Sequence, residues 1–127
     1  MARITVVDDY PAFLELVEQM LGDAGHEVTG MHGQEEVSVD QIAATKPELL
    51  LIDVMVAGET ATGWDVIALA RTHEALRKLP IIVSTGELLQ GEARLEKLAR
   101  LGNLHILDKP FTAEALYALT GRLLNGR

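Results

Sequence analysis

Short apolar runs alternate along the chain with stretches in which apolar residues recur at helical spacing. The runs predict strands at residues 4–7, 27–29, 49–52, 81–84 and 104–107. Three of them, 4–7, 49–52 and 81–84, hold almost no internal polar residues, which is typical of central parallel strands covered on both faces. The run at 27–29 is the weakest, so we expect it at an edge of the sheet.

The intervening stretches predict helices. One begins at Pro11, a residue that suits a first helical turn, and the others are predicted at 37–44, 64–76, 88–101 and 113–124, the last capped by Thr112. The apolar spacing predicts which residues face inward. In the helix that begins at Pro11 they are Phe13, Leu16, Val17, Met20 and Leu21. In the three later helices they are Val66, Leu69 and Ala70 (64–76), Leu95, Leu98 and Ala99 (88–101), and Leu116, Leu119, Leu123 and Leu124 (113–124). Leu14 falls off the first stripe, and we expect Trp64 to be partly buried.

Five strands alternating with five helices indicate repeated βα units around a parallel sheet, an α/β fold. The chain shows no internal repeat, low-complexity tract or linker, so residues 1–127 are expected to form a single domain with no output domain. At this length a chain buries roughly two-thirds of its unfolded surface, which supports a core without disulfides. The chain has no cysteine, which also excludes thiol chemistry.

The charge balance limits the partners. The chain has 11 Lys and Arg against 19 Asp and Glu, a formal charge of −8, which argues against nucleic-acid binding because such binding depends on basic side chains. The apolar run 4–7 ends at Asp8, too early for a secretory signal, and no stretch is long enough to span a bilayer. We therefore expect a soluble cytoplasmic protein that does not act at a membrane.

Polar side chains follow the predicted strands where each one ends. Asp8 and Asp9 follow the first strand, Asp53 the third, Ser84-Thr85-Gly86 closes the fourth, and Lys109 follows the fifth. The carboxyl ends of parallel strands meet at one edge of the sheet, where α/β proteins bind ligands. A single Asp after a strand is usually a turn former or a cap, but three carboxylates at one edge repel one another, so we expect a cation there.

Hard carboxylate oxygens suit Mg²⁺, and the ammonium of Lys109 suits a phosphate oxygen. Thr85 can donate a hydrogen bond to a phosphoryl oxygen. A carboxylate between a metal and a lysine is arranged to become an aspartyl phosphate. Asp53 stands alone after a central strand and is therefore the expected nucleophile, with Asp8 and Asp9 holding the metal.

Four segments carry a resemblance to a known family. They are residues 4–11 (ITVVDDYP), 49–55 (LLLIDVM), 80–86 (PIIVSTG) and 108–111 (DKPF). In this order and at about this spacing they resemble the signature segments of receiver domains of two-component response regulators, and the resemblance covers essentially the whole chain.

The resemblance implies a flavodoxin-like (βα)5 fold, a doubly wound, five-stranded parallel sheet of order 2-1-3-4-5. Asp53 would accept a phosphoryl group from a phosphohistidine of a sensor histidine kinase or histidine phosphotransfer protein. Asp9 and Asp53 would bind Mg²⁺ directly, Asp8 would bind it through water, and the backbone carbonyl of Met55 would be a further ligand. Lys109 and Thr85 would contact the phosphoryl oxygens.

The family resemblance also implies the output. Movement of Thr85 would repack the face formed by the helix at 88–101, the strand at 104–107 and the helix at 113–124, which would change affinity for a downstream protein. The domain would be a monomer or a phosphorylation-dependent dimer. Its product would be its own modified state, so it would catalyse only its own phosphorylation and dephosphorylation and would not be an enzyme in the usual sense.

The sequence departs from the family pattern in three places. Residues 54–62 form a loop about two residues longer than usual, and Ala57 stands where a proline is common. The longer loop either alters metal access, phosphoryl lifetime and kinase fit or is a tolerated insertion. Ile106 occupies the place of an aromatic switch residue. A threonine–aromatic relay cannot operate in its usual form with isoleucine there.

Three alternatives remain. The chain could be a degenerate receiver that binds partners without phosphorylation, as Ile106 and the longer loop suggest, or a receiver fragment of a larger regulator. A phosphatase of the haloacid dehalogenase type also uses an Asp nucleophile, Mg²⁺ and a lysine. That family requires a second Asp two residues after the nucleophile, where this chain has Met55.

Overall fold

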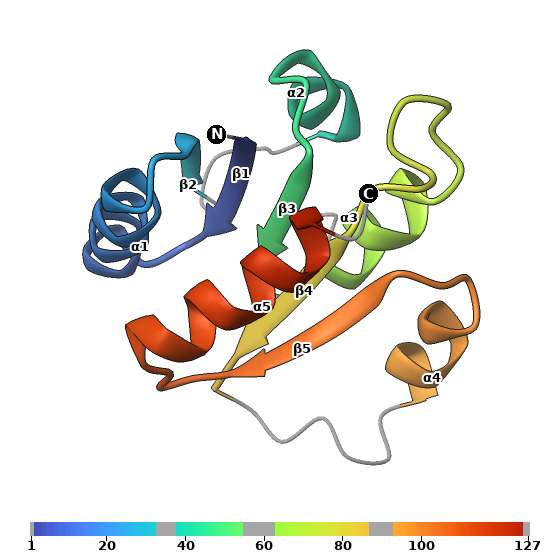
Figure 1. Cartoon of the computed structure of the whole chain (residues 1–127). Coiled ribbons are helices and arrows are strands. Elements are labelled where there is room, and N and C mark those ends of the chain that lie inside the picture. The colour runs from blue at the N-terminus through green and yellow to red at the C-terminus, as the bar shows by residue number, and fades with distance from the viewer. Residues whose placement is uncertain (1, 33–37, 55–62, 87–92, 126–127) are drawn as a thin grey trace.

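Strands and helices alternate strictly in the computed structural model, which describes residues 2–32, 38–54, 63–86 and 93–125 (Figure 1). The strands are β1 (Arg3–Asp8), β2 (Glu27–His32), β3 (Leu49–Ile52), β4 (Ile81–Thr85) and β5 (Leu104–Asp108). The helices are α1 (Pro11–Asp23), α2 (Val39–Ala44), α3 (Gly63–Ala70), α4 (Ala93–Ala99) and α5 (Ala113–Asn125). No helix of these ranges is long and apolar enough to cross a membrane.

The five strands form one parallel sheet in the order β2-β1-β3-β4-β5, so the predicted flavodoxin-like fold is confirmed (Figure 1). Helices α1 and α5 cover one face and α2, α3 and α4 the other, which gives two apolar clusters. The larger cluster includes Val7, Ile52 and Val83, and the smaller one includes Val6, Leu51 and Ile82. Successive residues of a strand thus enter opposite clusters.

The central strands are buried along their length, as their unbroken apolar runs predict. All four residues of β3 are buried, whereas most of β2 is exposed or half-buried, which confirms its edge position. The strand predicted at 49–52 has those bounds in the structure, and the other four are longer than predicted by one to three residues, chiefly at their carboxyl ends.

The predicted inward stripe of α1 is wrong at two positions, because it includes Leu16 and leaves out Leu14. Leu14, Val17 and Leu21 are buried, whereas Leu16 is 49% exposed. Both the 13/17/20 and the 14/17/21 series satisfy helical spacing, and the contact with the sheet decides between them. Leu69 of α3 is likewise 54% exposed, and Ala99 of α4 is exposed, so neither faces the core as predicted. Trp64 is more deeply buried than predicted, at 4% exposure.

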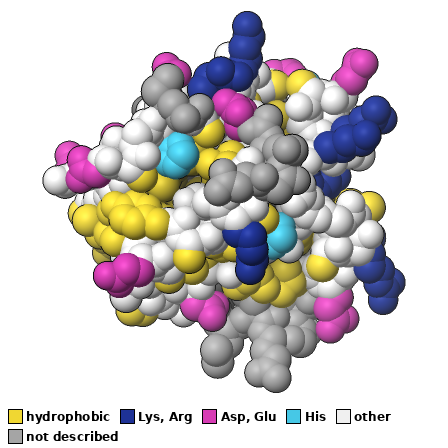
Figure 2. Space-filling model, in the orientation of Figure 1, with side chains coloured by type: hydrophobic (Ala, Val, Ile, Leu, Met, Phe, Trp, Pro, Cys, Tyr) yellow, Lys and Arg dark blue, Asp and Glu magenta, His cyan; other side chains and the backbone are white. Residues whose placement is uncertain are grey.

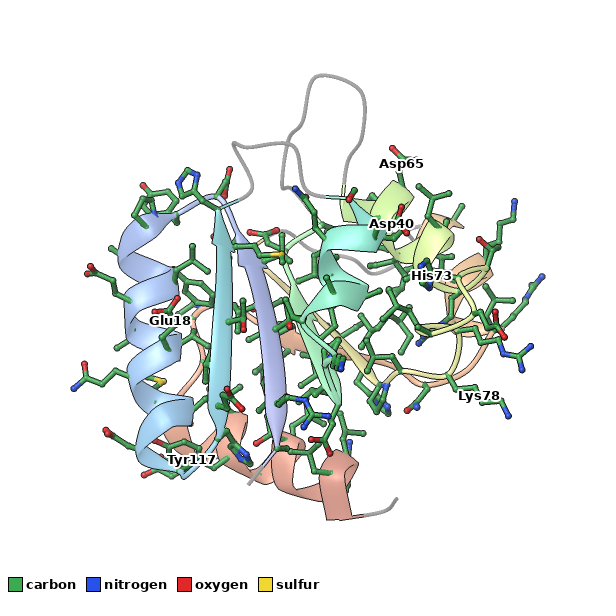
Figure 3. The ribbon with its side chains drawn as sticks, turned by 90° about the horizontal axis from the view of Figure 1, so that it is seen from above. Glu18, Asp40, Asp65, His73, Lys78 and Tyr117 are labelled. Atoms are coloured by element: carbon green, nitrogen blue, oxygen red, sulfur yellow. The ribbon has the colours of Figure 1, made fainter. Side chains whose placement is uncertain are left out.

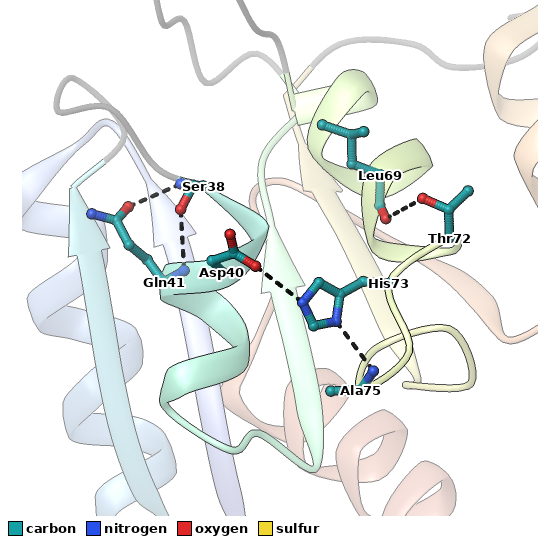
Figure 4. A network of polar contacts seen from close by, with 7 residues as sticks. All are labelled: Ser38, Asp40, Gln41, Leu69, Thr72, His73 and Ala75. Atoms are coloured by element: carbon teal, nitrogen blue, oxygen red, sulfur yellow. Dashed lines mark hydrogen bonds and ion pairs between the residues drawn. The ribbon is translucent and has the colours of Figure 1, made fainter.

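Three predicted helices are shorter in the structure. Helix α2 begins at Val39 because Ser38 caps it, with its hydroxyl accepting from the amide of Gln41 (Figure 4). Helix α3 ends at Ala70, and turns continue to Lys78, although Leu76 is fully buried and extends the apolar pattern. Helix α4 covers Ala93–Ala99, and residues 88–92 of its predicted range lie outside the described residues.

Side chains join neighbouring elements around the sheet. His73, in the turns after α3, is 3.2 Å from Asp40 of α2 and accepts from the amide of Ala75 (Figure 4). The Tyr117 hydroxyl of α5 donates to the carbonyl of Met20 near the end of α1 (Figure 3). Thr112 accepts from the amide of Ala115 at 3.0 Å, as expected of a cap.

A glycine holds α3 close to the end of β3. A Cβ atom on Gly63 would lie 2.5 Å from Cα of Val54 and 2.6 Å from the carbonyl oxygen of Asp53. Backbone atoms cannot move aside as a flexible side chain would, so the close approach requires glycine. The start of α3 thereby fixes the chain beside Asp53.

The half-buried guanidinium of Arg71 ties two loops together at the amino ends of β4 and β5. It donates to the carbonyls of Leu76 and Leu79 and, at 3.2 and 3.0 Å, to those of Gly102 and Asn103. Burial lowers the pKa of this guanidinium, but arginine stays protonated in proteins. The planar fork therefore joins four carbonyl groups from the two loops.

Replacing Arg71 should weaken the fold. We expect Arg71→Met to lower the free energy of unfolding by about 2 kcal/mol, because carbonyls lose charge-assisted bonds that a thioether cannot replace. Urea denaturation measures the change, with the exposed Arg77→Met as the matched control. Equal stability of the two variants would contradict this role of Arg71.

Candidate functional site

Three carboxylates meet at the carboxyl edge of the sheet, as predicted. Asp8 ends β1, Asp9 follows it, and Asp53 follows β3, where its amide donates to the carbonyl of Val7. One carboxylate oxygen from each lies within 4.8 Å of the others. Asp8 and Asp53 are 1% and 7% exposed, and Asp9 is half-buried.

Lys109 joins two of these carboxylates. Its ammonium donates to Oδ2 of Asp8 at 2.7 Å and to Oδ2 of Asp53 at 3.0 Å. The side chain reaches them from the loop between β5 and α5, in which the Lys109–Pro110 peptide is cis. Residues separated by 101 and 56 positions in the sequence thus form one bridged cluster.

Two aromatic rings orient the Lys109 side chain. Its ammonium lies 3.9 Å from the ring centroid of Phe13 on α1. Phe111 packs edge-on against Phe13, with ring centroids 5.7 Å apart. The apolar pattern predicts Phe13 as a core residue, but its contact with the site lysine is visible only in the structure.

The site carries more negative than positive charge. Burial raises the pKa of the Asp8 carboxyl, although the hydrogen bonds from Lys109 and from the Tyr10 amide act in the opposite direction. Burial of Lys109 would lower the pKa of its ammonium, but its bonds to Asp8 and Asp53 prevail and raise that pKa. Three carboxylates and one ammonium carry an excess of negative charge that a further cation would balance. The donor set, hard oxygens at a partly exposed edge, fits Mg²⁺.

Other predicted site residues are less completely described. Thr85 ends β4 opposite Asp108, which places it at the same edge, but its side chain lies outside the described part of the chain. Met55 and the longer loop at 55–62 also lie outside it. Ile106 pairs with Val83 in the edge strand β5 and is 42% exposed. Its side chain therefore lies at the surface.

One buried hydroxyl near the site has no partner. Ser84 is 1% exposed, and its Oγ makes no hydrogen bond with any described group. The sequence shows a polar residue at the strand end but gives it no role. The pairing of Ile52 with Val83 is the signal that could have found it, because Asp53 and Ser84 are the next residues along the chain.

An apolar groove of about 480 Å³ opens beside Lys109. It runs along α1 and the segments that follow β4 and β5, and its lining consists of Tyr10, Phe13, Leu16, Met20, Gly86, Lys109, Pro110 and Phe111. Tyr10 is 69% exposed, and Leu16, which the apolar pattern predicts to face inward, is 49% exposed. Leu14, which fell off the predicted stripe, is buried and does not line the groove.

The fold and this edge define the class of the protein. Residues 4–120 match the response regulator receiver domain, so the chain belongs to the family of receiver domains of two-component response regulators. It is a receiver of the CheY type. Receiver domains are signalling switches rather than enzymes that release a product.

Particular relatives agree with this assignment. The chain is 25% identical over 114 residues to the chemotaxis protein CheY of Pseudomonas aeruginosa, covering 90% of this chain and 89% of that one. It is 32% identical to the sensor protein GacS of Pseudomonas syringae pv. syringae over 90% of its own length, but spans only 12% of GacS. The chemotaxis protein CheY4 of Vibrio cholerae superposes with a TM-score of 0.79, at 25% identity and coverage of 98% and 99% of the two chains.

The excess negative charge has a measurable consequence. Without divalent cations at pH 7, we expect Asp8→Asn to have a higher free energy of unfolding than the original protein, because burial disfavours the Asp8 charge. The pKa of Asp8 is raised in the folded protein, so the folded state takes up a proton at a higher pH than the unfolded state does. As the pH falls through that folded-state pKa, the free energy of unfolding of the original protein therefore rises relative to that of the variant.

The advantage of Asp8→Asn should therefore shrink on acidification. Chemical denaturation of both proteins in a chelating buffer, from pH 7 down to pH 4, measures it. A less stable Asp8→Asn at pH 7 would show that the bond from Lys109 outweighs the burial of the carboxylate.

Proposed function

We propose that this receiver is switched by phosphorylation of Asp53, with Mg²⁺ bound by Asp53, Asp9 and Asp8. The observation that carries the proposal is the bridge from Lys109 to both Asp8 and Asp53, with Asp9 within reach of the same point. A site built for stability alone would not concentrate three carboxylates at a partly open edge.

The chain's residues have distinct parts in this reaction. An oxygen of Asp53 forms a bond to phosphorus while the P–N bond of a phosphohistidine breaks, and the imidazole keeps the electron pair and takes up a proton. Lys109 stays near Asp53 and neutralises the phosphoryl oxygens. Mg²⁺ adds positive charge at the same oxygens when it is bound.

The remaining predictions extend this proposal. Thr85 would donate to a phosphoryl oxygen, and the backbone carbonyl of Met55 would complete the metal ligands. The face of α4, β5 and α5 would carry the signal to a partner protein. Ile106 stands where an aromatic switch residue is usual, and it lies at the surface of β5. The change in affinity for the partner would therefore not depend on an aromatic side chain turning inward.

A phosphorylation-independent interaction module is the second candidate. It is favoured by Ile106, which cannot serve as an aromatic switch. The intact cluster of Asp8, Asp9, Asp53 and Lys109 favours the first proposal, because a module that never binds a phosphoryl group gains nothing from buried like charges.

Incubation with acetyl phosphate tests the proposed function. We expect one phosphoryl adduct in the intact-protein mass, which requires Mg²⁺ and is lost in Asp53→Asn and in a chelating buffer. Asp65→Asn, which changes an exposed carboxylate of α3, should retain the adduct. Absence of any adduct from the folded protein would favour the interaction module.

The apolar groove suits the phosphohistidine donor. It lies directly beside Lys109, so a helix of a histidine kinase or phosphotransfer protein seated there would bring its phosphohistidine to Asp53. Exposed apolar side chains at a groove are typical of protein contacts, and Leu16 is an exposed apolar residue of the lining.

A charge in the groove should slow phosphoryl transfer from a protein donor but not from a small-molecule donor. We expect Leu16→Glu to slow transfer from a histidine phosphotransfer protein by about tenfold or more, because a carboxylate would be buried in the contact. Phosphorylation by acetyl phosphate should not change. Leu69→Glu, at a similarly exposed leucine of α3, is the control. Equal transfer rates for both variants would place the donor elsewhere.

A further inference from the structure

The Ser84 hydroxyl is a buried polar group without a partner. Its residue is 1% exposed, and Oγ has no hydrogen-bond partner among the described residues. Buried hydroxyls are nearly always paired, because losing water without gaining a partner is unfavourable. An unpaired one therefore needs an explanation.

The strand register places Ser84 beside Asp53. Val7 pairs with Ile52, and Ile52 pairs with Val83. The next residues along the chain are Asp8, Asp53 and Ser84, so the same register continued by one residue aligns them in a row at the carboxyl ends of β1, β3 and β4. Neighbouring strands lie about 4.8 Å apart, so side chains adjacent in a row are within mutual reach.

These three side chains also lie on the same side of the sheet. Val6, Leu51 and Ile82, two positions earlier in each strand, all enter the cluster covered by α1 and α5. Side chains alternate between the two faces along a strand, so residues two positions apart lie on the same face. The ammonium of Lys109 contacts Asp8 and Asp53 there.

We propose that Ser84 is a further catalytic hydroxyl of the receiver site, which donates a hydrogen bond to the acyl oxygen of phosphorylated Asp53. This inference rests on the proposed function, and it assigns Ser84 a role distinct from that of Thr85. Phosphorylation converts one Asp53 oxygen into the bridging oxygen of an acyl phosphate and leaves the other as a carbonyl.

The charge balance explains why the bond forms only in the phosphorylated state. In the present structure Lys109 donates to Asp53 Oδ2 and holds that oxygen. A phosphoryl group brings further anionic oxygens that attract the ammonium. The carbonyl oxygen would then lack the ammonium as a donor, and the Ser84 hydroxyl, which has no partner in the unmodified protein, would donate to it instead.

Beryllofluoride, a phosphoryl mimic that binds the carboxylate, tests this role with Mg²⁺ present. We expect Ser84→Ala to bind the mimic about fivefold to tenfold more weakly, the loss of one hydrogen bond. Its melting temperature without the mimic should equal or exceed that of the original protein, because an unpaired hydroxyl has been removed. Calorimetric titration measures affinity, and thermal melting measures stability.

Thr5→Ala is the matched control. Thr5 is also a buried hydroxyl of the sheet, but it is paired with Thr45 at 2.6 Å and lies away from the site. We expect this variant to melt at a lower temperature and to bind beryllofluoride normally. Ser84→Thr, which keeps the hydroxyl, should retain most of the affinity.

Three outcomes would overturn the role of Ser84. They are unchanged beryllofluoride affinity in Ser84→Ala, a lower melting temperature of that variant without the mimic, or an equal loss of affinity in folded Ser84→Thr. If the original protein itself binds no beryllofluoride and takes up no phosphoryl group, the proposed function fails and the role of Ser84 fails with it.

Discussion

The bridge of Lys109 to Asp8 and Asp53 is the interaction on which the carboxyl edge of the sheet depends. Two buried carboxylates on neighbouring strands repel each other, and one ammonium from the far side of the sequence holds them together. The aromatic pair Phe13 and Phe111 keeps that ammonium in place. Because Asp9 adds a further negative charge, the arrangement favours an additional cation.

The fold supplies this geometry through elements far from the chemistry. Parallel β1 and β3 end at the same level, Gly63 allows α3 to begin against the backbone of Asp53, and Arg71 secures the loops at the opposite end of β4 and β5. Figure 2 shows basic side chains at several separate places on one face, interspersed with acidic ones.

The sequence predicts those features that depend on chain order. The parallel sheet and the meeting of Asp8, Asp53 and Lys109 follow because strand ends share one edge. Features that depend on packing were harder to predict. Leu14 and Leu16 satisfy the helical period equally well, and buried Leu76 lengthened the predicted α3 although it lies in a turn. The unpaired state of Ser84 requires knowledge of every neighbouring donor and acceptor.

Calorimetric titration with Mg²⁺ tests most directly whether the excess charge of this edge exists to hold a cation. We expect saturable binding of one Mg²⁺ per chain, strongly weakened in Asp53→Asn and Asp9→Asn and unchanged in Asp65→Asn. Absence of saturable binding to the folded protein, or binding that Asp53→Asn leaves intact, would contradict it.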